Sequence, residues 1–438
     1  MAIDFTPRRV RNGFRCVVTR PRHDVAQTVA VFGALVSVIL LGWSSDLLGV
    51  QHEDLEVYRF GVEAWWSGQD IYGTLPPTSA GVHLPFLYPP FAVLILSPLA
   101  VLPWSAAVLT LFLLNLACLV ATLYVVLRAI APQLSVPVAL TIAGAASAPA
   151  LLLEPLRQTF HFGQVNLLLM GLVAVDCLAR RTPWPRGMAL GIAAAIKLTP
   201  VAFILFFLAR RDYRSAAVAA ATGLTAGAVG FLIDWEASMT YWFNGFELMS
   251  WMSGTPYLTN QTLEASIARY DLGEPTQTIA WAGLTLTLLG TVWFVIRRSG
   301  AALSMLLIAA FALLASPTSW SHHWVWVAPA IVLMGGYAVD RWERNRTAAI
   351  SWLCAATFTA ALFYLAPFAL VPGSADRELA WTVPQQFLGN SYTWFTILLI
   401  SGYAAASAAH RDRPLAGTTV RRDVEPNQPS RWADRSCD

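Results

Sequence analysis

Apolar runs long enough to cross a lipid bilayer recur along almost the whole chain, and this feature constrains the fold more than any other. A membrane-spanning helix needs about 20 mostly apolar residues. Hydrophobic residues make up 56% of the sequence, a share that excludes an ordinary soluble protein. We therefore expect an all-α polytopic membrane protein with about twelve transmembrane helices, at 25–43, 86–103, 104–128, 134–153, 164–179, 187–209, 214–233, 277–296, 301–315, 322–338, 347–370 and 391–409.

The basic residues predict how these helices are oriented. They stand in short arginine clusters beside the apolar runs, which is typical of cytoplasmic segments and not of a nucleic-acid-binding surface. An even number of spans puts both tails on the same side of the membrane, and their arginines predict that this side is the cytoplasm. We expect a basic tail at 1–24, one transmembrane domain at 25–409 and a disordered tail at 410–438. Three long loops then lie on the external face, at 44–85, 234–276 and 371–390.

One part of the chain does not fit this simple topology. Arg180-Arg181 and Arg210-Arg211 flank the apolar run 187–209, and a helix that spans once cannot have both of its ends in the cytoplasm. Either the arginine rule fails locally, or the helices near 134–153 and 187–209 are broken or re-entrant.

The first external loop holds an unusual concentration of acidic residues. Glu53, Asp54 and Glu56 fall within four positions, at the start of a short helix that the sequence predicts over residues 53–66. Carboxylates in the first turn of a helix are favoured by its dipole, so all three can be ordinary solvated side chains. Alternatively, Asp54 points towards a site that the external loops enclose.

Helical spacing gives this short helix two different faces. Asp54 and Tyr58 lie one turn apart on the first face. The second face is apolar, and we expect it to lie flat on the membrane surface, with Leu55, Val62 and Trp66 directed downward.

Lys197 is the only lysine of the chain, and it falls inside the apolar run 187–209. On membrane-insertion scales a lysine at the centre of a helix costs about 3 kcal/mol. Pro200 should break the helix nearby and open a polar cavity around the ammonium group. The lysine either snorkels from a helix end or binds an anionic lipid head group.

Two adjacent histidines, His322 and His323, open the helix predicted at 322–338 at its outer end. Neighbouring residues on a helix point about 100° apart, which does not suit joint metal ligation, and no HExxH motif accompanies them. They are either interfacial side chains, or one of them binds a phosphate at the helix N-terminus, where the dipole favours anions.

Other polar side chains stand where apolar runs begin or loops end. The amides of Gln164, Asn166, Asn260 and Gln261 suit hydrogen bonds to sugar hydroxyls. Trp320 is one of several external-loop tryptophans that form either an interfacial belt or a stacking surface for sugar rings. The sequence has no P-loop, no Rossmann glycines and no metal-ligand spacing among its five cysteines, so we expect no cofactor and no metal.

The order of the short motifs resembles glycosyltransferase family 87, over about residues 50 to 400. Each motif is weak alone, and their common order and spacing carry the resemblance. The motifs are Asp54-Leu55-x-Val57-Tyr58, Gly68-x-x-x-Tyr72, Leu84-Pro85-Phe86-x-Tyr88-Pro89-Pro90-Phe91, Gly163-Gln164-Val165-Asn166, Lys197-Leu198-Thr199-Pro200, Asn260-Gln261-Thr262-Leu263 and Ser319-Trp320-x-His322-His323-Trp324.

The resemblance implies a GT-C fold and a mannosyltransferase of the plasma membrane that acts on the external face. Such an enzyme takes mannose from a polyprenyl-phosphate carrier and forms an α-1,2 linkage to a phosphatidylinositol mannoside or lipomannan. The essential aspartate of the family maps onto Asp54, which would be the general base of an inverting reaction. Lys197, His322 and His323 would bind the donor phosphate. The expected substrate-binding residues are Tyr58, Tyr88, Gln164, Asn166, Asn260, Gln261 and Trp320.

Two other functions stay open at the level of sequence. A decaprenyl-phosphate-arabinose-dependent arabinofuranosyltransferase would use the same scaffold, and the residues do not distinguish the two sugars. A lipid or sugar transporter is the second alternative. Against it, the two halves of the chain show no internal repeat, and the polar residues gather at one face of the membrane instead of its midplane.

Overall fold

The computed structural model describes residues 52–244 and 255–409, and the regular secondary structure of this part is helical, as predicted. The predicted span at 25–43 and most of both tails lie outside the described residues. The α-helices are α2 (Glu53–Trp66), α3 (Phe91–Val101), α4 (Trp104–Ile130), α5 (Val136–Ala150), α6 (Glu154–Phe162), α7 (Asn166–Leu178), α8 (Met188–Ile196), α9 (Ile204–Ala209), α10 (Tyr213–Ile233), α11 (Trp235–Phe243), α13 (Leu263–Ala268), α14 (Glu274–Ile296), α15 (Ala301–Ala315), α16 (Val327–Arg341), α17 (Arg346–Leu365), α18 (Val383–Gly389) and α19 (Ser391–Ala409). Four 3-10 helices join them, η1 (Thr199–Phe203), η2 (Ser321–Trp326), η3 (Pro367–Leu370) and η4 (Arg377–Ala380).

Several of these helices are long and apolar enough to cross a membrane. Within the described residues four qualify, namely α4, α10, α14 and the stretch Arg346–Leu370, and a fifth is added if the bent pair α5–α6 counts as one span. The protein is therefore a helical membrane protein, and the number of twelve spans stays a prediction.

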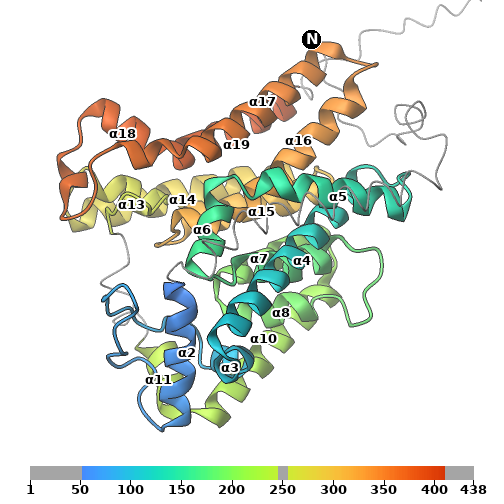
Figure 1. Cartoon of the computed structure of the whole chain (residues 1–438). Helices are drawn as coiled ribbons and strands as arrows, with labels where there is room; N and C mark the ends of the chain where they lie inside the picture. Colours follow the sequence, from blue (N-terminus) through green and yellow to red (C-terminus); the bar gives the residue numbers. More distant parts are fainter. Residues whose placement is uncertain (1–51, 245–254, 410–438) are drawn as a thin grey trace, which may run out of the picture.

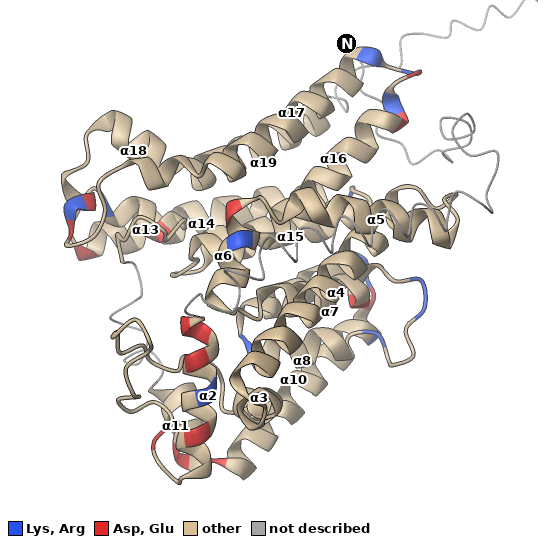
Figure 2. Ribbon diagram, viewed as in Figure 1, with Lys and Arg blue, Asp and Glu red and all other residues tan. Residues whose placement is uncertain are grey.

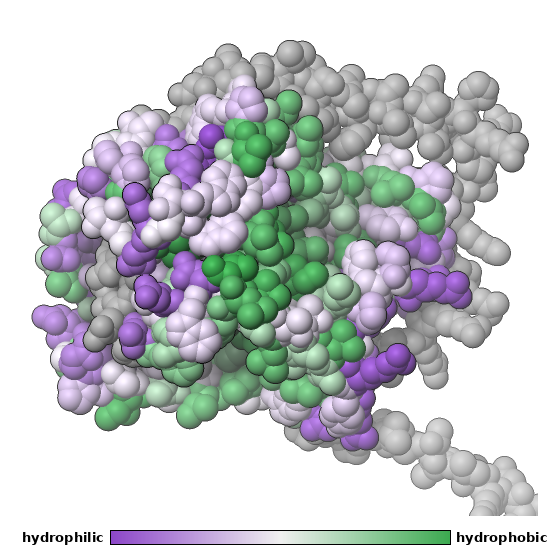
Figure 3. Space-filling model, turned by 90° about the horizontal axis from the view of Figure 1, so that it is seen from below, coloured by the Kyte–Doolittle hydropathy of each residue, from purple (hydrophilic) through white to green (hydrophobic). Residues whose placement is uncertain are grey.

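The surface agrees with a lipid environment. Figure 3 shows apolar side chains in the middle of one face, between two more polar margins. Large apolar side chains stand exposed on the long helices: Leu224 and Leu232 of α10 are 75% and 85% exposed, and Ile279 of α14 is 73% exposed. Exposure on this scale is costly in water and favourable against lipid acyl chains.

The helices are arranged around a central layer (Figure 1). In that view α13, α14 and α15 cross the middle, with α16, α17 and α19 above them and α2, α3, α4, α7, α8 and α10 below. Helix α6 stands upright between α2 and the central layer, and it packs against η2. Segments that are far apart in the sequence thus meet where α2, α6 and η2 converge.

Of the two alternatives that the arginine pairs left open, a break near 134–153 is present in the structure. Helices α5 and α6 meet at an angle of 82°, with Leu151, Leu152 and Leu153 between them. Prolines lie on both sides of the bend, with Pro149 in the last turn of α5 and Pro155 in the first turn of α6.

The run 187–209 is also broken, and the break resolves the conflict between the arginine pairs. Helix α8 ends at Ile196, and η1 begins at Thr199 with a proline next to it. Lys197, in the break between α8 and η1, bonds to Asn166 at the start of α7. Arg186 and Arg210, at the two ends of the run, both lie close enough to Cys177, near the end of α7, to interact with it electrostatically. The chain thus runs in along α8 and returns through η1 and α9, as a re-entrant segment.

Helix α2 has the bounds predicted for it, Glu53–Trp66, and Figure 2 shows acidic residues along it. The prediction that its apolar face lies on the membrane surface is wrong for Leu55 and Val62. Both are fully covered by protein, whereas Trp66 is 50% exposed. The reason is that α2 packs against α3 and α6, so both of its faces are used inside the protein.

Candidate functional site

Asp54 lies in the first turn of α2, where its carboxylate is only partly exposed. Burial raises the pKa of Asp54 to about 6 because the charged form loses hydration. A hydrogen bond from the Gln164 side chain and the positive charge of Lys197 act in the opposite direction and favour the carboxylate. Asp54 can therefore hold or release a proton near neutral pH.

A chain of polar side chains connects α2 to the segment after α6. The hydroxyl of Tyr58, one helical turn beyond Asp54, donates to Gln164 Oε1 over 2.8 Å. The Tyr88 hydroxyl lies 2.8 Å from that of Tyr58 and 3.3 Å from Gln164 Oε1. All three side chains are buried. The face of α2 that the sequence assigned to Asp54 and Tyr58 therefore does point into a polar cluster.

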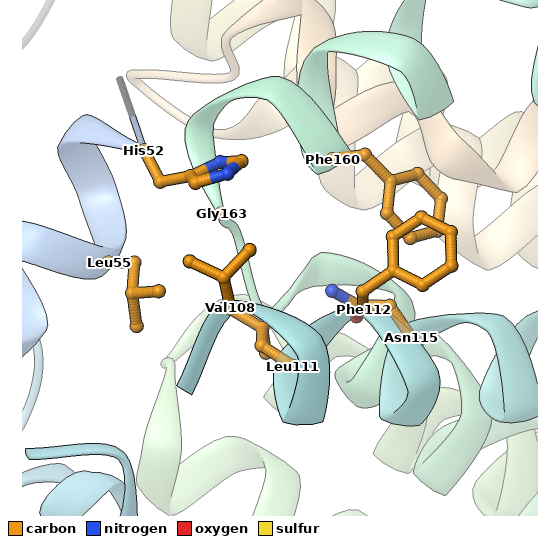
Figure 4. A pocket seen from close by; sticks show the side chains of 8 residues that line it. All are labelled: His52, Leu55, Val108, Leu111, Phe112, Asn115, Phe160 and Gly163. Carbon is orange, nitrogen blue, oxygen red and sulfur yellow. The ribbon is translucent and has the colours of Figure 1, made fainter. Parts of the chain in front are cut away.

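Gly163 lets this segment come close to α2. Its φ of +71° is a left-handed conformation that ends α6, and a Cβ at this position would lie 2.8 Å from the Cβ of Leu55. Beneath the contact, His52, Val108 and Phe160 surround a cavity of about 10 Å³ (Figure 4). That volume suits about one water molecule and no substrate, so this cavity is a packing feature.

Lys197 is held on the other side of the cluster by two hydrogen bonds. Its ammonium donates to Asn166 Oδ1 over 3.3 Å and to His323 Nε2 over 3.1 Å. It also lies 5.4 Å from the centre of the Tyr88 ring. Because His323 Nε2 accepts this bond, the proton of the neutral His323 ring is on Nδ1. The prediction that Pro200 breaks the helix beside Lys197 is confirmed.

His322 lies beside Lys197, but on a 3-10 turn instead of the predicted α-helix. Its backbone carbonyl accepts hydrogen bonds of 3.0 Å from both Asn166 Nδ2 and Thr159 Oγ1. The ring is 8% exposed, and its Nε2 has no hydrogen-bond partner among the described residues. A buried ring nitrogen left without a partner is costly unless a ligand engages it.

The structure thus brings together eight of the residues predicted for the site. They come from α2, the segment before α3, the turn after α6 and the start of α7, the break between α8 and η1, and η2: Asp54, Tyr58, Tyr88, Gln164, Asn166, Lys197, His322 and His323.

The other three predicted residues belong to a different network. Asn260 and Gln261 are fully buried, and their amide atoms bond to protein groups such as the carbonyls of Pro317 and Gly389. Trp320 pairs with Asn260 through the backbone and packs edge-on against Tyr257. The structure shows these side chains holding loops together, and their predicted contact with sugar stays a prediction.

Three polar residues near the site were missed by the sequence reasoning. Asn115 of α4 donates to the Gln164 carbonyl over 2.8 Å, and Thr159 supports His322 as described above. The buried carboxylate of Glu154 accepts from Ser321 and Tyr392 over 2.6 and 3.0 Å and so fixes the start of η2. For Asn115 and Glu154, an amide or a carboxylate within or beside an apolar run was the available signal.

The chemistry of the cluster is that of one carboxylate and one ammonium, linked by neutral donors and acceptors. Within the described residues, no group of three or more His, Cys, Asp or Glu side chains is placed to hold a metal ion. The carboxylate can take a proton, and the ammonium and the His322 ring can face an anion.

Comparison with known proteins identifies the family. The profile of glycosyltransferase family 87 matches residues 86–317, more than half of the 438-residue chain. The chain belongs to glycosyltransferase family 87. The resemblance drawn from the motifs is therefore confirmed.

Two relatives are named polyprenol-phosphate-mannose-dependent alpha-(1-2)-phosphatidylinositol mannoside mannosyltransferase. The one from Mycobacterium tuberculosis is 36% identical over 79% of this chain and 83% of its own length. The one from Mycolicibacterium smegmatis is 36% identical over 86% of this chain and 89% of its own. A third, from M. smegmatis, is named as the corresponding phosphatidylinositol pentamannoside mannosyltransferase and is 31% identical over 71% of this chain and 77% of its own.

Among solved structures, ArnT from Cupriavidus metallidurans bound to undecaprenyl phosphate overlaps 87% of this chain and 78% of its own, at 17% identity and a TM-score of 0.40. A likeness this loose supports no statement about the site.

Proposed function

We propose that this family 87 glycosyltransferase moves mannose from polyprenyl-phosphate-mannose to a phosphatidylinositol mannoside and forms an α-1,2 linkage. The observation that carries the proposal is the named activity of two relatives that are 36% identical over at least 79% of the chain. The relative named for a pentamannoside acceptor is less similar, at 31%. The proposed acceptor is therefore the phosphatidylinositol mannoside named for the two more similar relatives, and not the pentamannoside. Lipomannan is a further acceptor to test.

The proposed reaction is a single in-line displacement. A β-linked mannosyl phosphate that gives an α-linked product must invert at the anomeric carbon, and this needs one base and no covalent intermediate. Asp54 takes the proton of the acceptor hydroxyl as the oxygen attacks, while the bond to the phosphate oxygen breaks and its electrons stay on the leaving phosphate. A carboxyl with a pKa of about 6 is ionised at neutral pH and still basic enough for this task.

In this proposal Lys197 and His322 bind the donor phosphate. The ammonium has two of its three protons directed to Asn166 and His323, which leaves one for a ligand. His322 Nε2 is buried and otherwise unused. His323 acts through Lys197, because its own Nε2 is occupied by the ammonium. Together these groups stabilise the charge that develops on the leaving phosphate.

The membrane setting follows from the substrates. Both are lipids with polar heads, so the reaction takes place at the edge of a leaflet, and we place the site on the external face of the plasma membrane in a GT-C scaffold. Consistent with this, the turn between α16 and α17 and the loop between α7 and α8 carry arginine clusters, as expected of cytoplasmic segments (Figure 2).

The test uses the purified full-length protein in lipid nanodiscs. It is given radiolabelled polyprenyl-phosphate-mannose with a phosphatidylinositol mannoside acceptor or lipomannan, and in parallel a decaprenyl-phosphate-arabinose donor. We expect label in a glycolipid product that an α-1,2-specific mannosidase releases. Transfer from the arabinose donor alone, or no transfer from either donor to any acceptor, would overturn the proposal.

A further inference from the structure

We propose that Asn166 is a positioning residue, which holds Lys197 and His322 in a fixed relation to each other and does not itself contact a sugar. The sequence analysis assigned Asn166 to substrate binding, so this is a different role. The inference rests on the proposed function, because Lys197 and His322 are the groups assigned there to the donor phosphate.

The side-chain amide of Asn166 is bonded at both of its ends. Its Oδ1 accepts from the Lys197 ammonium over 3.3 Å, and its Nδ2 donates to the backbone carbonyl of His322 over 3.0 Å. An ammonium can only donate and a carbonyl can only accept, so the amide has one possible orientation. Asn166 is 7% exposed, which limits competition from water for both bonds. A single planar group therefore ties the break between α8 and η1 to η2.

The His322 carbonyl is held from two helices. Thr159 of α6 donates to it from Oγ1 over 3.0 Å, beside the bond from Asn166 at the start of α7. Two donors use both lone pairs of the oxygen. The Phe162 ring of α6 meets the His322 ring edge-on, with 5.3 Å between the ring centres. Backbone and ring are thus fixed together, and the ring keeps its Nε2, which has no hydrogen-bond partner among the described residues, for a ligand.

Lys197 gains most from being held, because its side chain is flexible. Ordering the four-carbon stem of a lysine costs conformational entropy. The bonds to Asn166 and His323 order the ammonium within the protein itself. Groups that are already in place bind an anion with a smaller loss of entropy than groups that must be ordered on binding. Removing the Asn166 amide should therefore weaken phosphate binding, although the amide does not touch the phosphate.

Sugar binding by Asn166 predicts a different loss. It would use the second Nδ2 proton or the second lone pair of Oδ1 on a hydroxyl of the mannose or of the acceptor. Its removal would then leave unchanged the binding of a lipid phosphate that has no sugar. Polyprenyl phosphate, which has the phosphate and the chain of the donor but no mannose, separates the two roles.

The experiment measures mannose transfer by the full-length enzyme in lipid nanodiscs, and its inhibition by polyprenyl phosphate. In Asn166→Leu we expect the donor kcat/KM to fall about tenfold, the inhibition constant of polyprenyl phosphate to rise about tenfold, and the acceptor KM to stay within about threefold. Thr159→Val removes the other donor to the His322 carbonyl and should move both donor quantities in the same direction by about threefold. Thr122→Val is the matched control, because its hydroxyl bonds to the carbonyl of Cys118 within α4, and both quantities should keep their wild-type values.

A double substitution tests whether Asn166 acts through the lysine. In a Lys197→Met background, Asn166→Leu should lower the donor kcat/KM by a smaller factor than in the wild type, because one of the two groups that it positions is absent. Equal factors in the two backgrounds would contradict the inference.

Unchanged inhibition by polyprenyl phosphate in Asn166→Leu would overturn the inference, and a raised donor or acceptor KM beside it would return Asn166 to sugar binding. Failure of the proposed function has a different signature, because the wild type itself would then transfer no mannose from polyprenyl-phosphate-mannose. If Asn166→Leu does not melt as a folded protein, Thr159→Val decides the question, and wild-type constants in that variant would overturn the inference.

Discussion

Replacing Lys197 with methionine tests the donor side of the site. An ammonium about 4 Å from a phosphate oxygen gains about 4 kcal/mol per unit charge at an effective dielectric constant of about 20. The donor phosphate starts with one negative charge and gains a second as it leaves, and about half of that develops in the transition state. Lys197→Met should therefore cost about 2 kcal/mol of transition-state stabilisation, or about 30-fold in kcat.

The assay is mannose transfer in nanodiscs, at a temperature well below melting. The substitution also leaves Asn166 and His323 without the donor that they accept from, so some loss of thermal stability is expected as well. Arg59→Met is the matched control. It removes one half-buried positive charge from α2, where Arg59 bonds to the carbonyls of Leu99 and Leu102, and activity should stay within about threefold. A Lys197→Met enzyme with kcat within threefold of the wild type would refute the phosphate role.

Three further predictions concern pH and stability. Because the ionised form of Asp54 is the active one and its pKa is about 6, kcat/KM should fall as the pH drops through 6, to about a tenth of its plateau at pH 5, and a flat profile would contradict this. Gly163→Ala should lower the free energy of unfolding by about 1–3 kcal/mol, because φ is +71° and the new Cβ would lie 2.8 Å from the Cβ of Leu55 in α2. An unchanged melting temperature would show that the turn relaxes freely. Glu154→Leu leaves the hydroxyls of Ser321 and Tyr392 without their acceptor and should lower the free energy of unfolding by about 2–5 kcal/mol. Glu154→Gln keeps an acceptor and should lower it less. Equal melting curves for the two variants would contradict the hydrogen-bonding account.

The sequence predicted well wherever one local rule decided the structure. Helical spacing gave α2 its bounds and placed Asp54 and Tyr58 on one face, and the bounds of α15 and α19 also agree. Pro200 indicated the break beside Lys197, and the conflicting arginine pairs left a broken or re-entrant run as one of two alternatives. These features depend on periodicity, on proline geometry and on charge placement, all of which can be seen in a single sequence.

What the sequence could not predict depends on tertiary packing. Leu55 and Val62 form an apolar face that would suit a membrane surface equally well, and only the position of α3 and α6 shows that protein covers them. In the same way, amides suit sugars and buried backbone alike. Nothing local distinguishes Gln164, beside the carboxylate, from Gln261, which bonds to the carbonyl of Gly389 within the protein.

The most direct test of the central claim compares Asp54→Asn with the wild type in single-turnover transfer of mannose, both enzymes being saturated with donor and acceptor. Asparagine keeps the size of the side chain and removes its ability to accept a proton. We predict that the variant is folded, binds both lipids and transfers mannose at least about a thousandfold more slowly. Transfer within tenfold of the wild-type rate would contradict the assignment of Asp54 as the base.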